Sequence, residues 1–191
     1  MTVLVSHSGS NTLAYEVTAG LAAENKSVRF ETAFFYRRDG VVARLVRLLP
    51  APLRRAVERE LMRRHDPRLD GSLVRLFPWF EVIYVALKRL SLSEPRLQRV
   101  LLWRDHAFDR RIARVVARER PGLVIAHDGQ ALATICAAKR HGAVSVLNRV
   151  TGFVSEAMLL YREEAELCPE VADSLSRSEE HTSELQSRLH L

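Results

Sequence analysis

The residues best suited to chemistry in this sequence lie in a short turn near its amino terminus. A β-branched run at residues 2–6 is followed by His7, Ser8, Gly9, Ser10 and Asn11. If a helix begins there, backbone N–H groups and two hydroxyls would lie near an anion at the helix amino terminus. The turn matches neither GxGxxG nor GxxxxGK(S/T), so a nucleotide phosphate loop is not indicated. A tight strand-to-helix turn also favours Gly and a Ser or Asn cap for structural reasons alone.

A second turn, His127-Asp128-Gly129, follows the apolar run at residues 123–126. Imidazole titrates near neutral pH, so His127 is the candidate catalytic residue, able to bind a sugar hydroxyl or to transfer a proton. The alternative is a histidine paired with neighbouring backbone, with Asp128 capping the next helix. Together with the first turn, these three residues form the predicted substrate-binding set.

Several other chemistries are not indicated by any motif. Cys136 and Cys168 are the two cysteines of the chain, and no CxxC, HExxH or related spacing suggests a metal site. GxSxG is absent, which disfavours an α/β-hydrolase nucleophile. Two cysteines cannot build a disulfide framework, so a reducing, cytoplasmic compartment is expected.

The hydrophobic pattern predicts one open, parallel α/β sheet of Rossmann-like type, with helices on both faces. Strands are expected at residues 2–6, 28–35, 123–126 and 144–148. A mostly helical insertion, residues 37–120, separates the second strand from the third, with helices expected at 41–49, 53–64, 79–90 and 95–120, the last long enough to be two. Further helices are expected from residue 10 or 11 to about 24, at 130–141 and at 153–167.

The expected topology decides where a ligand would bind. Right-handed crossovers place the first strand beside both the second and the third, which makes a switch point. Ligands of such sheets lie beyond the carboxyl ends of the strands. The turns at residues 7–11, 127–129 and 148–152 are therefore expected to converge on one edge of the sheet.

Composition describes a globular chain with a basic segment. The 191 residues are 47% hydrophobic and 27% charged, with no apolar run long enough for a membrane span and no signal peptide. Residues 36–64 contain nine arginines against three acids. This clustering indicates an anionic partner, either phospholipid headgroups or a phosphorylated substrate, whereas codon bias accounts only for a general excess of arginine. The residues expected at such a surface are Arg37, Arg38, Arg54, Arg55, Arg63 and Arg64.

Two features of the helical insertion have competing interpretations. The arginine cluster is either a membrane-surface site or a solvated helix face without a partner. An apolar stripe at helical spacing is expected to be core, although a position on a membrane surface is the alternative. Its members are Trp79, Phe80, Tyr84 and Leu87.

Residues 131–148 and 153–170 resemble the N-terminal domain of family 4 glycosyltransferases. The shared features are an Ala-rich helix ending in AK-x-x-G, a strand, and a helix ending in EEAEL-x-P. This chain departs from the family at two turns. Where it has His127-Asp128-Gly129, family members often have an aromatic-acidic turn, and at residues 148–151 they often have Asp-Leu-Pro. The resemblance implies a GT-B architecture of two Rossmann-like domains, in which the N-terminal domain holds the acceptor and the C-terminal domain holds the nucleotide-sugar.

This resemblance implies a metal-independent, retaining hexosyltransferase that needs no cofactor. Its partners would be a nucleotide-sugar donor, a glycan or lipid-linked acceptor and an anionic membrane surface, with no nucleic acid. Such an enzyme would be cytoplasmic and peripheral at the inner membrane face. Two other functions stay open: a non-catalytic α/β module that binds anionic surfaces, and part of a sugar-nucleotide epimerase.

The end of the chain is expected to be foreign to the protein. Residues 177–187 read RSEEHTSELQS, which resembles the translation of a sequencing adapter. Residues 1–175 would then be the native domain, and residues 176–191 a tail whose removal leaves stability unchanged. Because the resemblance places the donor site in a domain beyond residue 175, the chain alone is expected to be inactive and to bind donor no more tightly than millimolar.

Overall fold

A computed structural model describes residues 1–9, 12–24, 26–89, 94–149 and 154–169 of the chain. The chain divides into two units, residues 1–147 and 148–191, which we describe separately. The tail at residues 176–191 and the expected domain boundary at residue 175 lie outside the described residues, as do Ser10, Asn11 and residues 150–152.

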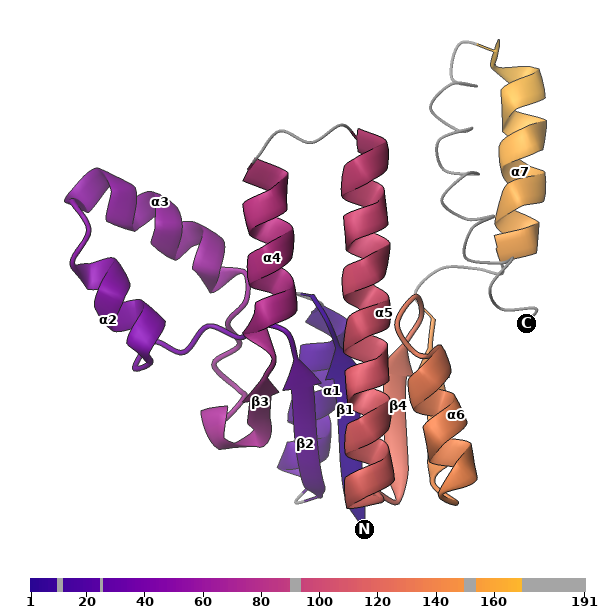
Figure 1. Ribbon diagram of the computed structural model, residues 1–191, viewed down its shortest axis with the longest axis horizontal. Coiled ribbons are helices and arrows are strands. Elements are labelled where there is room, and N and C mark those ends of the chain that lie inside the picture. Colours follow the sequence, from indigo (N-terminus) through magenta and orange to yellow (C-terminus); the bar gives the residue numbers. More distant parts are fainter. Residues whose placement is uncertain (10–11, 25, 90–93, 150–153, 170–191) are drawn as a thin grey trace. The chain divides into compact units, whose positions relative to one another are not determined.

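The first unit is built on an open parallel sheet (Figure 1). Its strands are β1 Thr2–His7, β2 Ser27–Thr32, β3 Val74–Leu76, β4 Leu123–His127 and β5 Val144–Asn148, in the order β3-β2-β1-β4-β5. β1 pairs in parallel with both β2 and β4. The expected central position of the first strand is therefore confirmed, and the switch point lies between β1 and β4.

The sheet has one strand that the sequence pattern did not predict. β3 is three residues long and pairs with β2 through Phe30 opposite Val74 and Thr32 opposite Leu76. Residues 37–120 are therefore not a purely helical insertion, because the chain returns to the sheet at β3. A strand this short shows no alternation of its own, and here it runs into the apolar start of the next helix.

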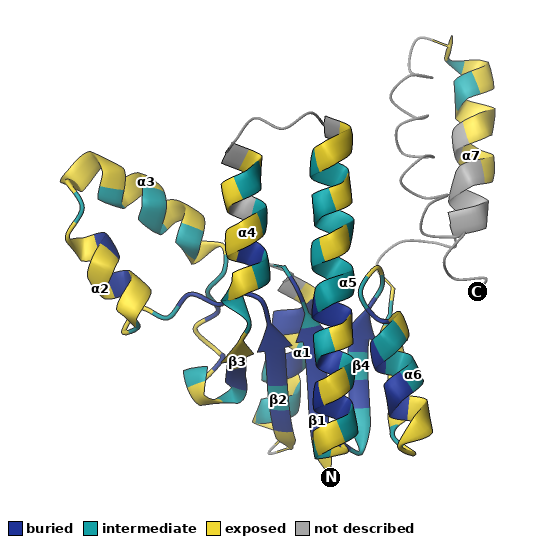
Figure 2. Ribbon diagram, viewed as in Figure 1, coloured by how far each residue is buried: buried dark blue, intermediate teal, exposed yellow. Residues whose placement is uncertain are grey.

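Two hydrophobic cores lie on opposite faces of the sheet, as the alternation along β1 requires. Val3 and Val5 pack with Tyr15 of α1 (Thr12–Ala23) and Phe30 of β2. Leu4 faces the other way, toward α5 (Glu94–Glu119) and α6 (Leu132–Arg140). Figure 2 shows these strands as the most deeply buried part of the fold. Helices on both faces are thus confirmed.

The remaining helices of the first unit are α2 (Val41–Arg47), α3 (Ala51–Met62) and α4 (Pro78–Arg89), with a short 3-10 turn at Gly71–Leu73. Pro50 ends α2 and precedes α3, which buries none of its residues. α4 and the first half of α5 extend beyond the carboxyl ends of the strands (Figure 1). α5 is one continuous helix of 26 residues rather than two.

The amino terminus of α6 is capped from another helix. Asp109 of α5 is 3% exposed and accepts hydrogen bonds from Ala133 N at 2.7 Å and Thr134 N at 2.9 Å. α6 ends before Gly142, whose φ of 72° explains the glycine there. A long-range contact therefore supplies a capping carboxylate for α6.

Replacing Asp109 by alanine is expected to lower the free energy of unfolding by about 1–2 kcal/mol, because two helix N–H groups lose their acceptor. Urea denaturation measures the change. Asp128→Ala is the matched control, and we expect it to cost less. An equal loss in both variants would show that Asp109 has no special role as the cap.

The second unit contains α7 (Val154–Leu167), where the described side chains include the exposed Leu159, Leu160 and Leu167. Within the described parts of both units, no helix combines the length and the apolar character that crossing a bilayer requires.

Candidate functional site

The turn after β1 is held by hydrogen bonds within the protein. Ser8 N donates to Gln130 Oε1 at 2.6 Å, and Gly9 N lies 3.0 Å from His7 Nδ1. These two N–H groups therefore already have acceptors. The expected presentation of backbone donors to an anion is wrong for Ser8 and Gly9, while Ser10 and Asn11 lie outside the described residues.

His7 and His127 come together at the switch point, as the topology predicts. Their strands are neighbours, with Ser6 opposite Ala126 in the parallel register. The two rings meet edge to face with their centroids 5.0 Å apart. His127 is 1% exposed, and His7 is half-buried. Residues separated by more than a hundred positions thus form one histidine pair at the carboxyl edge of the sheet.

The protonation of the pair follows from its surroundings. Burial lowers the pKa of His7 and that of His127 below the ordinary value of 6.5, so both imidazoles are neutral at neutral pH. His127 Nδ1 donates to the Ser6 carbonyl at 3.1 Å, which assigns the proton of this neutral ring to Nδ1. His7 Nδ1 lies 3.0 Å from both the nitrogen and the carbonyl oxygen of Gly9, so it accepts from Gly9 N in one tautomer of the ring and donates to Gly9 O in the other.

Both rings of the histidine pair are therefore held through Nδ1 by neighbouring backbone. A neutral imidazole has one donor and one acceptor nitrogen, the two kinds of group with which a hydroxyl pairs. Asp128 and Gly129 complete the second turn, where a φ of 79° at Gly129 accounts for the glycine. Gln130, the next residue, accepts the hydrogen bond from Ser8 N and so connects the second turn with the first.

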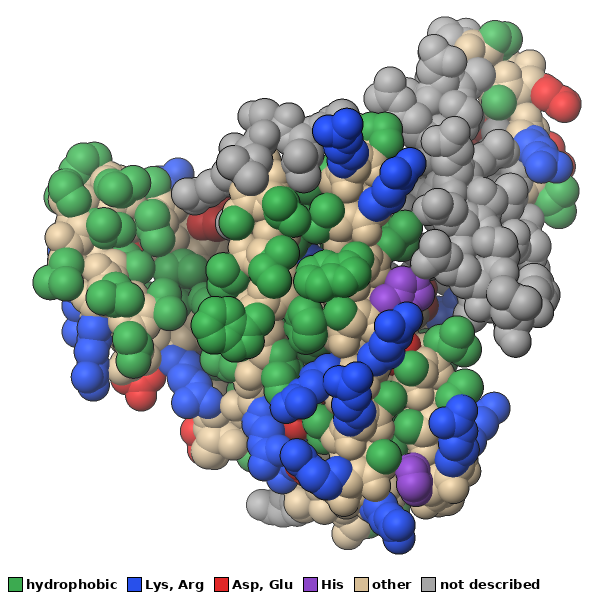
Figure 3. All heavy atoms as spheres, in the orientation of Figure 1, with side chains coloured by type: hydrophobic (Ala, Val, Ile, Leu, Met, Phe, Trp, Pro, Cys, Tyr) green, Lys and Arg blue, Asp and Glu red, His purple; other side chains and the backbone are tan. Residues whose placement is uncertain are grey.

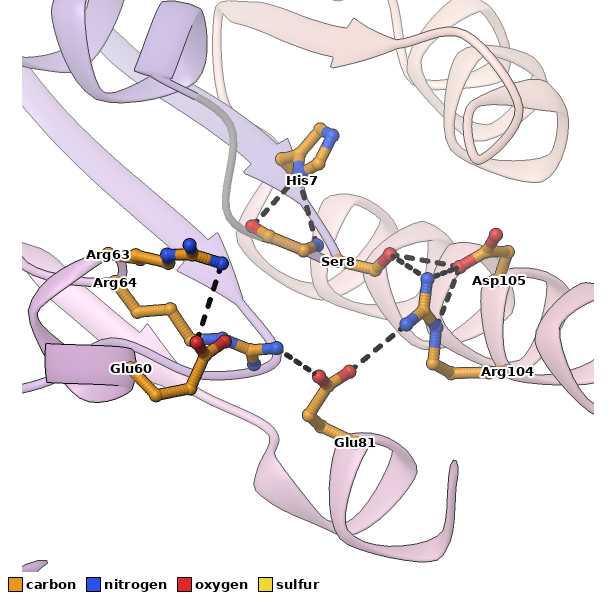
Figure 4. Close-up of polar contacts among 9 residues, drawn as sticks. His7, Ser8, Glu60, Arg63, Arg64, Glu81, Arg104 and Asp105 are labelled. Carbon is orange, nitrogen blue, oxygen red and sulfur yellow. Dashed lines mark hydrogen bonds and ion pairs between the residues drawn. The ribbon is translucent and has the colours of Figure 1, made fainter. Parts of the chain in front are cut away.

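A network of charged side chains contacts the first turn through the hydroxyl of Ser8 (Figure 4). Ser8 Oγ donates to Asp105 Oδ1 at 2.9 Å, and the same carboxylate accepts from Arg104 at 2.8 Å. Arg104 also reaches Glu81 at 3.1 Å, and Glu81 accepts from Arg64 at 2.6 Å. We call Ser8, Asp105, Arg104, Glu81 and Arg64 the charged network. Two arginines and two carboxylates balance its charge.

The arginines expected at an anionic surface divide into two groups. Arg37 donates to the carbonyls of Gly71 and Val74, and Arg64 pairs with Glu81 while lying 5.7 Å over the ring of Phe34. Both guanidinium groups make contacts within the domain, and their role at an anionic surface stays a prediction. The other four are on or beside α2 and α3, where Arg63 pairs with Glu60 at 3.4 Å; they are Arg38, Arg54, Arg55 and Arg63.

The apolar residues expected to form a core stripe lie on α4, and only some of them are buried in the core. Phe80 packs against the second core and meets Trp103 at 6.1 Å between ring centroids, and Tyr84 lies under Arg104 at 4.9 Å. Trp79, however, is 75% exposed. The expectation that this residue is core is therefore wrong.

Sequence reasoning missed the supporting residues Glu81, Arg104, Asp105 and Gln130. One signal was present, because Glu81 stands inside the apolar run Trp79-Phe80-Glu81-Val82-Ile83. A charge in such a run is usually paired when it is buried. Its partners lie far along the chain, and no spacing rule identifies them.

The site combines two neutral histidines with a charged network whose formal charges cancel. Within the described part of the chain, no group of three or more His, Cys, Asp or Glu side chains could hold a metal ion. Comparison of the chain with protein-family models, with curated proteins and with solved structures finds no match.

Proposed function

We propose that this chain is the acceptor-side half of a glycosyltransferase, which transfers a sugar from a nucleotide-sugar to a glycan or lipid-linked acceptor. The histidine pair is the observation that carries the proposal. It brings two neutral imidazoles together at the carboxyl edge of β1 and β4. This is the edge at which parallel α/β sheets bind their ligands.

The chemistry of the site favours a sugar hydroxyl over a phosphate. The charged network is neutral overall, and the N–H groups of Ser8 and Gly9 are already paired. A phosphate would need unpaired donors or excess positive charge here. A pair of neutral imidazoles can instead hydrogen-bond to an acceptor hydroxyl and orient it for attack.

The donor site belongs to the second domain implied by the resemblance to family 4 glycosyltransferases. This chain would therefore bind acceptor without transferring sugar. An epimerase or another dinucleotide-binding protein would behave in the opposite way, because it would hold its nucleotide at the turn after β1.

Titration of protein with 15N-labelled histidines distinguishes these possibilities. A panel of neutral oligosaccharides is expected to shift the Nε2 resonances of His7 and His127, whereas UDP-glucose, GDP-mannose and NAD bind no more tightly than millimolar. His127→Gln and His7→Ala are each expected to weaken saccharide binding about tenfold, as loss of one hydrogen bond to a bound ligand does.

His141→Ala is the matched control, since this histidine is exposed at the end of α6. We expect it to leave binding unchanged. Micromolar binding of NAD or a nucleotide-sugar, with shifts centred on residues 7–9, would overturn the acceptor assignment. So would a panel in which no saccharide shifts either histidine.

A further inference from the structure

The second half of α5 and the neighbouring strands carry a group of arginines that the candidate site does not use. We call this group the arginine cluster, and its members are Arg29 of β2, Arg75 of β3, and Arg111, Arg114 and Arg118 of α5. The three on α5 are spaced i, i+3 and i+7, which places them on one face of the helix. Figure 3 shows Lys and Arg side chains gathered over this half of α5.

Three guanidinium groups of the cluster converge on one carboxylate, that of Glu119 at the end of α5. Arg75 Nη1 and Arg118 Nη2 donate to the same oxygen, Glu119 Oε1, at 2.9 and 2.8 Å. Arg29 pairs with the other oxygen, Oε2. Guanidinium groups from a helix and from two strands are therefore held side by side around a single negative charge.

The cluster has more positive charge than its carboxylates balance. Glu31 is the second acid nearby; burial raises its pKa, and four guanidinium groups oppose that rise, those of Arg75, Arg29, Arg111 and Arg118. Arg111 and Arg114 form no ion pair with any residue that the structure describes, and Arg111 instead lies 4.8 Å over the ring of Phe77. Even with Glu31 ionised, five arginines face two carboxylates.

Two of these guanidinium groups are accessible to a ligand. The side chains of Arg75 and Arg118 are 47% and 65% exposed. A guanidinium has five N–H donors, so each of these groups retains donors that Glu119 does not use. Because Glu119 already holds the two groups together, a ligand would meet them without rearrangement of the fold.

We propose that the arginine cluster binds a terminal phosphate group, either inorganic phosphate or the phosphate of a small phosphomonoester. Such a group has three or more oxygens and about two negative charges, and guanidinium forks match its oxygens. It would lie beside Glu119 on the exposed side of Arg75 and Arg118, with Arg114 next on the same helix face. A dianion offsets most of the excess charge, and the convergence on one carboxylate gives a site the size of one oxyanion.

The arginine cluster is distant from the histidine pair along the strands. Arg118 and Glu119 end α5, and β4 begins shortly afterwards, so they lie near the amino end of that strand. His7 and His127 are the last residues of β1 and β4, at the carboxyl edge. The proposal therefore does not depend on the glycosyltransferase assignment.

Calorimetric titration of the whole chain with inorganic phosphate, at constant ionic strength, tests the proposal. At about pH 8, where the phosphate is mostly a dianion, we expect saturable binding with a dissociation constant of about 1 mM or below. Dimethyl phosphate has a single charge and is expected not to bind measurably. Glycerol 3-phosphate separates the two sources of the group: tighter binding than inorganic phosphate assigns the site to an ester, and weaker binding assigns it to phosphate itself.

Arg75→Gln and Arg118→Gln are each expected to weaken phosphate binding about tenfold, as loss of a charge-assisted hydrogen bond does. Arg63→Gln is the matched control, because Arg63 is also an exposed arginine paired with a glutamate, Glu60. We expect it to leave phosphate binding unchanged. Melting temperature verifies that each variant is folded.

Three results would overturn the proposal. The first is no saturable binding of either inorganic phosphate or glycerol 3-phosphate. The second is an equal loss of binding in Arg63→Gln and Arg118→Gln, which would indicate general attraction to a basic chain. The third is a shift of the 15N resonances of His7 and His127 on addition of phosphate, which would place the anion at the histidine pair instead.

Discussion

Replacing Glu81 by alanine is expected to destabilise the first unit by about 3 kcal/mol, since loss of one partner leaves buried charges uncompensated. Glu81 is 5% exposed and pairs with Arg64 at 2.6 Å and with Arg104 at 3.1 Å. The side chain of Arg104 is 11% exposed, so water cannot replace the lost carboxylate there. Guanidinium denaturation of the two proteins measures the difference in unfolding free energy.

Glu60→Ala is the matched control for this prediction. Glu60 also pairs with an arginine, Arg63, but both side chains are exposed, at 67% and 74%. Exposed pairs contribute little, so the expected change is below about 1 kcal/mol. If Glu81→Ala and Glu60→Ala cost the same, the charged network is not a stabilising feature of this domain.

The charged network also connects stability with the candidate site. Asp105 accepts from Ser8 Oγ, and Ser8 N is fixed by Gln130, so the first turn is held from two sides. Loss of Glu81 would free Arg104 to move, and Asp105 with it. We therefore expect Glu81→Ala to weaken saccharide binding as well as stability.

The sequence was sufficient to predict the sheet around β1 and the convergence of its turns. The β-branched run at residues 2–6 and the βαβ order predict which strands lie together. Once β1 and β4 are neighbours, His7 and His127 must meet at the same edge. Topology thus brings together residues that no local motif relates.

The sequence was not sufficient where a contact is distant and carries no periodicity. β3 pairs with β2 through only three residues, and Asp109 caps α6 from a different helix. Whether an arginine is paired or exposed also depends on acceptors that lie far away in the sequence. Arg64 is bound because Glu81 is within reach, whereas Arg55 is exposed on a helix that buries none of its residues.

Glu31 is a buried acidic residue whose charge the fold does not fully compensate. It lies on β2, is 0% exposed, and neither carboxylate oxygen has a hydrogen-bond partner. Burial raises the pKa of Glu31 above its ordinary value of 4.5, and Arg75, Arg29 and Arg111 oppose that rise only in part. The folded domain therefore holds the Glu31 proton more tightly than the unfolded chain does.

The effect of Glu31 on stability has a definite sign. Below its ordinary pKa of 4.5 the carboxyl is protonated in both states and costs nothing extra. As pH rises from there through the higher pKa of the folded state, stability is lost, because only the unfolded chain ionises freely. Above the folded pKa the full cost of a buried, unpaired carboxylate is present.

Glu31→Gln keeps the shape of the side chain and removes its ionisation. We expect this variant to match the parent at acid pH and to exceed it in free energy of unfolding at alkaline pH, where the parent carries a buried carboxylate. Denaturation curves across the pH range measure the gap between the two proteins, so the titration of every other group cancels. Glu24→Gln, which removes a carboxyl group at an exposed position, is the matched control. A constant gap, or one that closes as pH rises, would mean that the arginines around Glu31 compensate its charge after all.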